Sequence, residues 1–351
     1  MVKIAFFGLD EHEQDVVREA FADERGYDVT LYTEPLTVEN VSLAHDAEGV
    51  GVFVLSHVTR EVLDRLPNLK IVAAMSTGFD HIDVDACREH NVAVCNVPHY
   101  GESTVAEFAF GLILALARKF RPTFARVDRG DFSRAGLTGM DLAGKTLGLI
   151  GTGRIGSHLA RIAHAMGMTV IAYDVKPNPA LTEDYGVRYM EINELLREAD
   201  VISLHVPYMK GTHHLINDER LRLVKNTALL INTSRGGVVD TTAVADALGE
   251  GRLGGVALDT FEGEQVWIGE EFQGTGEASV DELRDALESF GLLHSDKVIL
   301  TPHNAFNTQE AVERIIATSV ENLRAFFAGN PQNVVAGTFI APAPSAGGGR
   351  A

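Results

Sequence analysis

The chain has 351 residues, a length that suits about two domains of ordinary size. Hydrophobic residues make up 45% and charged residues 23%, as in globular proteins, so general disorder is excluded. The net charge of −19 at pH 7 leaves no dominant basic surface. We therefore expect neither nucleic acid nor an anionic membrane as a partner.

Cysteine use and hydropathy favour a cytoplasmic protein. Cys87 and Cys95 are too few for a disulfide framework, and no Cys-x-x-Cys spacing indicates zinc. The first residues lack the long apolar run of a signal peptide, so we expect none. The apolar stretch Phe108–Ala117 is about half as long as a membrane-spanning helix.

The first hundred residues alternate apolar runs with amphipathic stretches. Five runs predict strands: Val2–Phe7, Val29–Tyr32, Val50–Leu55, Ile71–Met75 and Val92–Cys95. Three stretches between them predict helices: Glu11–Ala22, Arg60–Leu66 and Val84–Glu89. Because the apolar runs are continuous, we expect a parallel sheet that is covered on both faces.

A long helix at Ala106–Lys119 and a polar connector at Asp128–Asp141 come next. A second alternating series then predicts six strands: Thr146–Ile150, Val170–Tyr173, Val201–His205, Ala228–Ile231, Gly255–Leu258 and Val298–Leu300. A final helix at Gln309–Ala328 has no predicted strand after it, and we expect it to pack back on the first domain.

These elements predict an α/β protein with two doubly wound parallel-sheet domains. The expected domains are a discontinuous one, residues 1–100 and 302–338, and a continuous one, residues 101–301. Residues 339–351, rich in Ala, Pro and Gly, are expected to form a mobile tail. The cleft between two such domains is the expected ligand site.

A glycine-rich turn marks the start of the second domain. Gly151, Gly153, Arg154, Ile155 and Gly156 belong to the run GTGRIG, which directly follows the strand Thr146–Ile150 and precedes a predicted helix. Glycines at this spacing permit a tight turn and let a pyrophosphate approach the N-terminus of the helix. The pattern predicts a Rossmann-type dinucleotide site.

Asp174 ends the next strand, 23 positions after Gly151. A carboxylate at this place accepts hydrogen bonds from ribose hydroxyls and repels a 2′-phosphate. The sequence therefore favours NAD over NADP as the cofactor, although the nearby Lys176 would soften that discrimination.

Four ionisable residues follow successive strands of the second domain. Arg235 follows Ala228–Ile231, Asp259 and Glu264 follow Gly255–Leu258, and His303 follows Val298–Leu300. Arginine suits a carboxylate substrate, and histidine exchanges protons near neutral pH. A carboxylate beside the histidine would hold its tautomer and keep it protonated. These residues predict a site for hydride and proton transfer at the carboxyl edge of the sheet.

Four stretches carry a resemblance to a known family. They are GTGRIG at 151–156, NTSRGG at 232–237, LDTFEGE at 258–264 and TPHNAF at 301–306. Together they resemble the D-isomer-specific 2-hydroxyacid dehydrogenases, especially the D-lactate dehydrogenase branch, and the similarity covers nearly all of residues 1–335. The resemblance implies a Rossmann NAD domain, a flavodoxin-like substrate domain and a small 2-keto or 2-hydroxy acid as substrate, with pyruvate as the expected acid.

The resemblance also implies roles for individual residues. Arg235 would bind the substrate carboxylate, His303 would be the acid/base, and Glu264 would be its partner. The backbone of Thr77 and Gly78 and the side chains of Tyr100 and Phe306 would also bind the substrate. The cofactor would be bordered by His205, Val206, Pro207, Thr233 and Asp259, and by His303.

Other interpretations remain open on the sequence. The positions near Ser56 and His57 lack the aromatic–glutamine pair of many lactate enzymes, so a glyoxylate, hydroxypyruvate or branched-chain 2-keto acid reductase is an alternative. A non-enzymatic, NAD-sensing protein of the co-repressor kind is another. The adjacent His213 and His214 could suggest metal, but no carboxylate at ligand spacing supports it, so we expect no metal site. Similarity of the helix at Ala106–Ala117 and its connector to the family implies a homodimer.

Overall fold

A computed structural model describes residues 1–22, 26–262 and 295–336 of the chain. The chain forms two units. Unit 1 combines Met1–Tyr100 with the segment that begins at Thr308, and unit 2 is Gly101–Asn307. In the described part of the chain, no helix combines the length and apolar character needed to cross a membrane.

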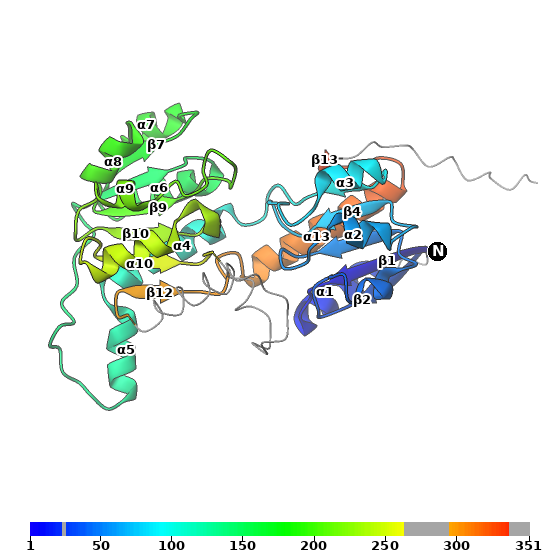
Figure 1. Cartoon of the computed structure of the whole chain (residues 1–351), viewed down its shortest axis with the longest axis horizontal. Helices are drawn as coiled ribbons and strands as arrows, with labels where there is room; N and C mark the ends of the chain where they lie inside the picture. Colours follow the sequence, from blue (N-terminus) through cyan, green and yellow to red (C-terminus); the bar gives the residue numbers. More distant parts are fainter. Residues whose placement is uncertain (23–25, 263–294, 337–351) are drawn as a thin grey trace, which may run out of the picture. The chain divides into compact units, whose positions relative to one another are not determined.

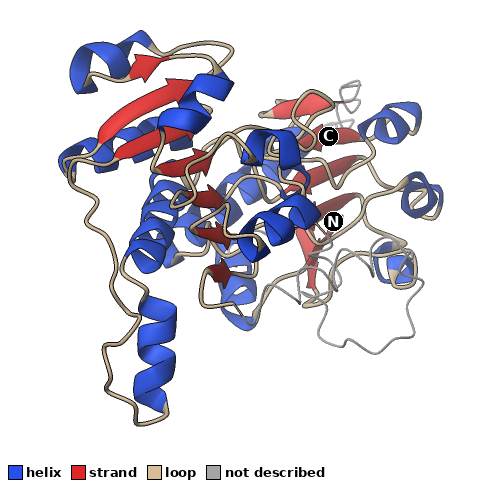
Figure 2. Ribbon diagram, turned by 60° about the vertical axis from the view of Figure 1, so that its left-hand side comes forward, coloured by secondary structure: helices blue, strands red, loops and turns tan. Residues whose placement is uncertain are grey.

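Unit 1 is built on a six-stranded sheet with the order β13-β5-β4-β3-β1-β2. Its strands are β1 (Val2–Phe7), β2 (Tyr27–Leu31), β3 (Gly49–Val52), β4 (Ile71–Ala74), β5 (Ala93–Cys95) and β13 (Val334–Ala336). Its α-helices are α1 (Glu11–Phe21), α2 (Arg60–Asp64), α3 (Val84–Glu89) and α13 (Gln309–Phe327), with a 3-10 turn at Val41–Ala44. The helices cover both faces of the sheet (Figure 2).

Local sequence explains where the helices of unit 1 begin. Asp10 and Glu13 form a reciprocal capping box at the start of α1, and Asp83 caps α3 by accepting from the Ala86 amide. All residues of β3, β4 and β5 are buried, which is why their sequences are continuously apolar. Helix α13 packs on α1 and β4, far from both in sequence (Figure 1).

One expectation for unit 1 was wrong. The chain does form a strand after its last helix, because β13 pairs antiparallel with β5 (Val334 opposite Cys95). The other neighbouring strands of this sheet are parallel. A three-residue run of Val and Ala carries no periodicity, and only the unpaired edge of β5 makes it a strand.

Unit 2 contains a fully parallel seven-stranded sheet with the order β12-β11-β10-β9-β6-β7-β8. Its strands are β6 (Thr146–Ile150), β7 (Thr169–Tyr173), β8 (Arg188–Tyr189), β9 (Val201–Leu204), β10 (Leu229–Asn232), β11 (Gly255–Leu258) and β12 (Val298–Leu300). Six were expected, and the two-residue β8 was missed. The strand order reverses beside β6, as in doubly wound sheets that bind dinucleotides.

Unit 2 has seven α-helices in the described ranges. They are α4 (Glu102–Ala117), α5 (Phe120–Asp128), α6 (Arg154–Ala165), α7 (Pro179–Tyr185), α8 (Ile192–Glu198), α9 (Asp218–Leu221) and α10 (Thr241–Gly249), with a 3-10 turn at Gly236–Val238. Helix α4 packs on α6 and on β10 and β11, so most of its surface is buried. This burial explains its apolar sequence without a membrane.

Helix α5 was not expected, and it forms an arm with the segment that follows it (residues 118–139). Both views show the arm extending away from the sheet of unit 2 (Figures 1 and 2). The amide of Met140 donates to the carbonyl of Ala117, which closes the arm at its base. Phe120 and Phe124 stack on α5, yet Phe124 is 62% and Phe132 is 79% exposed. The arm therefore presents aromatic side chains to solvent.

Candidate active site of unit 2

Two positions of the glycine turn between β6 and α6 require glycine, because backbone carbonyl oxygens lie close to them. Gly151 has φ +95°, and a Cβ there would lie 2.4 Å from the carbonyl oxygen of His205. A Cβ on Gly156 would lie 2.2 Å from the carbonyl oxygen of Gly151. Any larger residue at either position would force the backbone apart.

Gly153 differs from these two glycines, because a Cβ added there would meet no atom within 4 Å. It precedes α6, and no side chain caps the first turn of this twelve-residue helix. The N-terminal amides of α6 and the open space beside Gly153 suit a pyrophosphate. On this observation the turn fits the dinucleotide that the sequence predicts. Arg154 and Ile155 are the first residues of α6.

Asp174 follows β7 and also holds the glycine turn. Its carboxylate accepts from the Thr152 amide at 2.6 Å, from the Thr152 hydroxyl at 3.1 Å and from the Lys176 amide at 2.8 Å. A carboxylate has about four acceptor positions, so capacity remains for a ribose hydroxyl. The sequence motif predicted the contact of Asp174 with ribose but not its hydrogen bonds to the glycine turn.

His205, Val206 and Pro207 follow β9 and border the same turn. The carbonyl of His205 and the Val206 side chain are the groups that crowd Gly151. The His205 ring is partly exposed, but desolvation by the surrounding protein lowers its pKa to about 4. Its Nε2 lies 2.9 Å from the Ser203 hydroxyl. The imidazole is therefore neutral at pH 7.

Asn232, at the end of β10, organises the loop that carries Arg235. The side chain of Asn232 is fully buried and donates to the carbonyls of Arg235 (2.9 Å) and Thr260 (3.2 Å). Its Oδ1 accepts from the amide and the hydroxyl of Ser234. One amide thus holds the turn after β10 and joins it to the loop after β11. The motif NTSRGG contains Asn232 but does not indicate this role for it.

Thr233 lies between Asn232 and this turn. Its hydroxyl is buried and has no hydrogen-bond partner within the described ranges. A buried polar atom of this kind is rare unless a ligand or water satisfies it. The predicted place of Thr233 beside the cofactor is compatible with this observation.

Asp259, at the end of β11, organises the loop that carries His303. The side chain of Asp259 is 1% exposed. It accepts from the Thr301 hydroxyl at 2.5 Å and from the amides of Asn304 (2.8 Å) and Ala305 (2.9 Å). Burial raises the pKa of Asp259, and these hydrogen bonds oppose the rise. The buried carboxylate is a fixed part of the loop, a role that the sequence did not reveal.

The loops of Arg235 and His303 are therefore joined through β10 and β11. The amide of His303 donates to the carbonyl of Asp259, and the amide of Asp259 donates to the carbonyl of Asn232. His303 has φ +52°, a conformation that is rare for residues with a side chain. Because carboxyl ends of parallel strands meet at one edge of a sheet, both loops lie at the edge where the glycine turn also lies.

His214 of unit 2 lies beside two carboxylates that the sequence did not predict. His214 Nε2 lies 2.6 Å from Glu262 Oε1, and His214 Nδ1 lies 3.9 Å from Asp240. Sequence spacing hid these carboxylates, since they are 26 and 48 positions from His214. No group of residues suited to a metal ion occurs in the described ranges. The predicted partner of His303, Glu264, lies outside these ranges.

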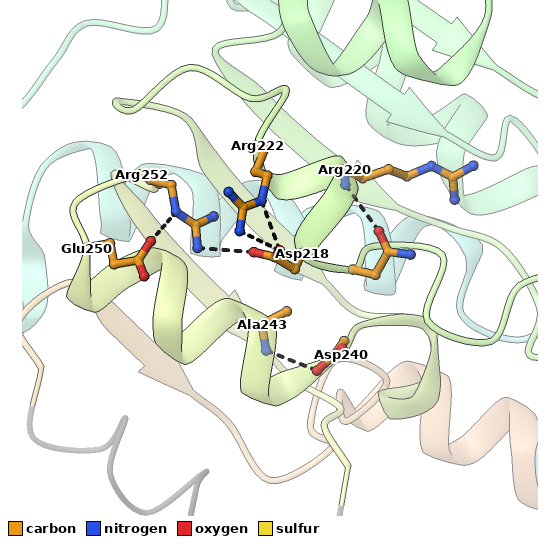
Figure 3. A network of polar contacts seen from close by, with 8 residues as sticks. Asp218, Arg220, Arg222, Asp240, Ala243, Glu250 and Arg252 are labelled. Atoms are coloured by element: carbon orange, nitrogen blue, oxygen red, sulfur yellow. Dashed lines mark hydrogen bonds and ion pairs between the residues drawn. The ribbon is translucent and has the colours of Figure 1, made fainter.

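Asp240 also caps α10 by accepting from the Ala243 amide at 3.0 Å (Figure 3). Beside it, Asp218 of α9 binds Arg222 and Arg252, and Arg252 also contacts Glu250. This ion network is largely exposed, so each pair contributes little to stability. It joins the ends of α9 and α10 and has no counterpart in the predicted site.

The other predicted substrate residues belong to different units. Thr77, Gly78 and Tyr100 are in unit 1, and Phe306 follows His303 in unit 2. Thr77 is exposed and Gly78 half-buried, in a bend after β4. The carbonyl of Tyr100 accepts from Arg314 Nε of α13 at 2.7 Å.

Comparison with known proteins agrees with this architecture. Residues 110–305 match the family model of the D-isomer-specific 2-hydroxyacid dehydrogenase, NAD-binding domain. A 2-hydroxyacid dehydrogenase homologue of Zymomonas mobilis is 37% identical, covering 92% of this chain and 96% of its own. The D-lactate dehydrogenase of Escherichia coli is 33% identical over the same shares.

Solved structures give the same result. The D-lactate dehydrogenase of Aquifex aeolicus, complexed with NAD and lactic acid, matches with a TM-score of 0.86 and 38% identity, covering 95% of this chain and 99% of that one. Sequence, fold and glycine turn thus agree on one family and one cofactor. The chain belongs to the D-isomer-specific 2-hydroxyacid dehydrogenase family and is an NAD-dependent enzyme of that family.

Proposed function

We propose that this enzyme reduces pyruvate to D-lactate with NADH and catalyses the reverse reaction. The D-lactate dehydrogenases among its relatives support pyruvate as the substrate. The joined loops of Arg235 and His303 are the observation that carries the proposal. A cation for a carboxylate and an imidazole for a proton are what 2-keto acid reduction requires.

In the proposed reaction the glycine turn and Asp174 would hold NADH, which would supply the hydride for the keto carbon. His303 donates a proton to the keto oxygen, and Glu264 is its partner. Arg235 binds the carboxylate and stabilises negative charge that develops on the keto oxygen. Asp259 and Asn232 act through these residues, because they hold the two loops in place.

We assign the remaining substrate contacts to the backbone of Thr77 and Gly78 and to the side chains of Tyr100 and Phe306. Two features of unit 1 support this assignment. The amides of Thr77 and Gly78 have no acceptor in the described part of the chain, so they are available to an anion. The backbone of Tyr100 is held by Arg314, which gives this position a defined place.

A panel of 2-keto acids, assayed with NADH and with product chirality determined, tests the proposal. We expect pyruvate to have the highest kcat/KM and the product to be D-lactate. A preference for glyoxylate, hydroxypyruvate or a branched-chain acid would identify that acid as the substrate in place of pyruvate. The proposed hydride and proton transfer would be unchanged. NADH binding without turnover of any acid would contradict the enzymatic proposal and favour an NAD-sensing protein.

We also propose that the enzyme is a cytoplasmic homodimer. The exposed Phe124 and Phe132 of the arm support a second copy as its partner, since exposed aromatic patches commonly mark interfaces. The arm carries six Arg or Lys against two Asp, in a chain of net charge −19, which favours contact with an acidic surface of another copy. Buried, unpaired Cys87 and Cys95 suit a reducing compartment.

A further inference from the structure

Three asparagines of unit 1 form a continuous hydrogen-bonded series. Asn333 Nδ2 donates to Asn322 Oδ1 at 2.8 Å, and Asn322 Nδ2 donates to the carbonyl of Asn96 at 2.9 Å. Asn96 Nδ2 then donates to the carbonyl of Thr77 at 2.7 Å. The series begins before β13, crosses α13 and ends on the loop that follows β4.

Three consecutive carbonyls of this loop, those of residues 76–78, are bound by the protein. The carbonyl of Ser76 accepts from the Val97 amide at 3.0 Å, and that of Gly78 accepts from the Ser76 hydroxyl at 2.6 Å. The carbonyl of Thr77 accepts from Asn96. A loop whose carbonyls are held in this way leaves its amides for a ligand, as an anion site needs.

The position of Asn322 on α13 makes the series notable. Its side chain is 1% exposed, and its neighbours on the buried face include Ile315, Val320 and Leu323. An apolar residue would bury this face of the helix at no cost in desolvated amide groups. An amide at this position makes two contacts that an apolar residue cannot: it donates to the carbonyl of Asn96 and accepts from Asn333.

We propose that Asn96, Asn322 and Asn333 are positioning residues for substrate binding. They hold the carbonyl of Thr77 inward, so that the amides of Thr77 and Gly78 bind the substrate carboxylate. Asn322 acts only through Asn96, so α13, which follows unit 2 in the chain, sets the geometry of a loop that lies more than 200 positions earlier. This inference rests on the proposed function.

The test compares Asn96→Ala and Asn322→Ala with the wild type and with Ser319→Ala. Ser319 is the matched control, because it is a buried residue of α13 whose hydroxyl has no partner in the described ranges. We expect both asparagine variants to raise KM for the 2-keto acid about tenfold while kcat changes less than about twofold, since the amides bind substrate and transition state alike. KM for NADH and all constants of Ser319→Ala stay unchanged.

The double variant Asn96→Ala/Asn322→Ala distinguishes positioning from general damage. If Asn322 acts through Asn96, the double variant raises KM no further than Asn96→Ala does, whereas independent effects would multiply. If Asn322→Ala does not fold, Asn96→Ala alone decides the matter, because its side chain bonds directly to the loop.

The outcomes separate the inference from the proposed function. If the wild type is active and the folded asparagine variants have the same KM as Ser319→Ala, the inference is overturned. The proposed function is then unaffected. A wild type that reduces no 2-keto acid overturns both.

Discussion

Two buried side chains, Asn232 and Asp259, carry most of the hydrogen bonds that shape the site of unit 2. Neither has a direct part in the proposed reaction. Each forms hydrogen bonds with several groups of a loop. The backbone at Arg235 and at His303 is therefore held in place. Catalytic geometry of this kind depends on residues behind the reacting groups.

We expect Arg235→Gln to lower kcat/KM for pyruvate by about a thousandfold, because a neutral amide replaces the bidentate cation. Steady-state kinetics with NADH measure the effect, and binding of NADH itself, followed by fluorescence, is expected to be unaffected. Arg220→Gln, on the neighbouring α9, is the control. Similar losses in both variants would contradict the assigned role.

His205 makes stability depend on pH. Its folded pKa of about 4 lies below the unfolded value, so the unfolded chain binds more protons between the two pKa values and stability falls as pH falls through that window. We expect the wild type to lose about 2 kcal/mol more than His205→Gln between pH 7 and pH 5. Urea unfolding of both proteins at the two pH values measures the difference, and parallel losses would refute it.

At the scale of the elements, the turn from β6 to α6 contains glycines that are needed for two different reasons. Gly151 and Gly156 serve the fold, because a side chain would meet backbone at either position. A side chain at Gly153 would enter open space, which is where the proposed pyrophosphate would bind. The same motif therefore contains residues whose substitution has different consequences.

We expect Gly153→Ala to fold with a melting temperature close to that of the wild type and to raise KM for NADH at least about tenfold, because its methyl group occupies space that the pyrophosphate needs. Gly211→Ala is the matched control, since a Cβ there also meets no neighbour. Thermal unfolding and NADH titration provide the two measurements. An unchanged KM for NADH would contradict binding of the pyrophosphate beside Gly153.

The elements also show how far sequence reasoning reaches. Long apolar runs predicted β1, β6 and β9, and the GTGRIG motif predicted the turn before α6, because these patterns are local. The short strands β8 and β13 were missed because only a neighbouring strand edge defines them. Helix α5 was missed because its exposed phenylalanines follow no core pattern.

The supporting residues of the sites were missed for a related reason. Asparagines such as Asn96 and Asn322 resemble ordinary surface residues in a sequence, and 226 positions separate this pair. The bond between them exists only once α13 packs on the sheet of unit 1. Motifs therefore indicated the candidate reacting groups, while the groups that hold them required the structure.

At the scale of the whole molecule, the arm of unit 2 is distinguished by the exposed side chains of Phe124 and Phe132. We expect the double variant Phe124→Glu/Phe132→Glu to be monomeric under conditions in which the wild type sediments as a dimer, because two charges would be buried in an apolar contact. Leu43→Glu, at an exposed apolar position of unit 1, is the control and is expected to stay dimeric. A monomeric wild type would contradict the proposed dimer.

The pairing of β13 with β5 has a consequence for synthesis on the ribosome. Unit 2 is continuous and can complete its folding while the last residues are still being translated. The first hundred residues cannot, since the strand that closes their sheet edge and the helix that covers β4 emerge last. During that interval β5 is an open edge, the kind of surface that chaperones protect from aggregation.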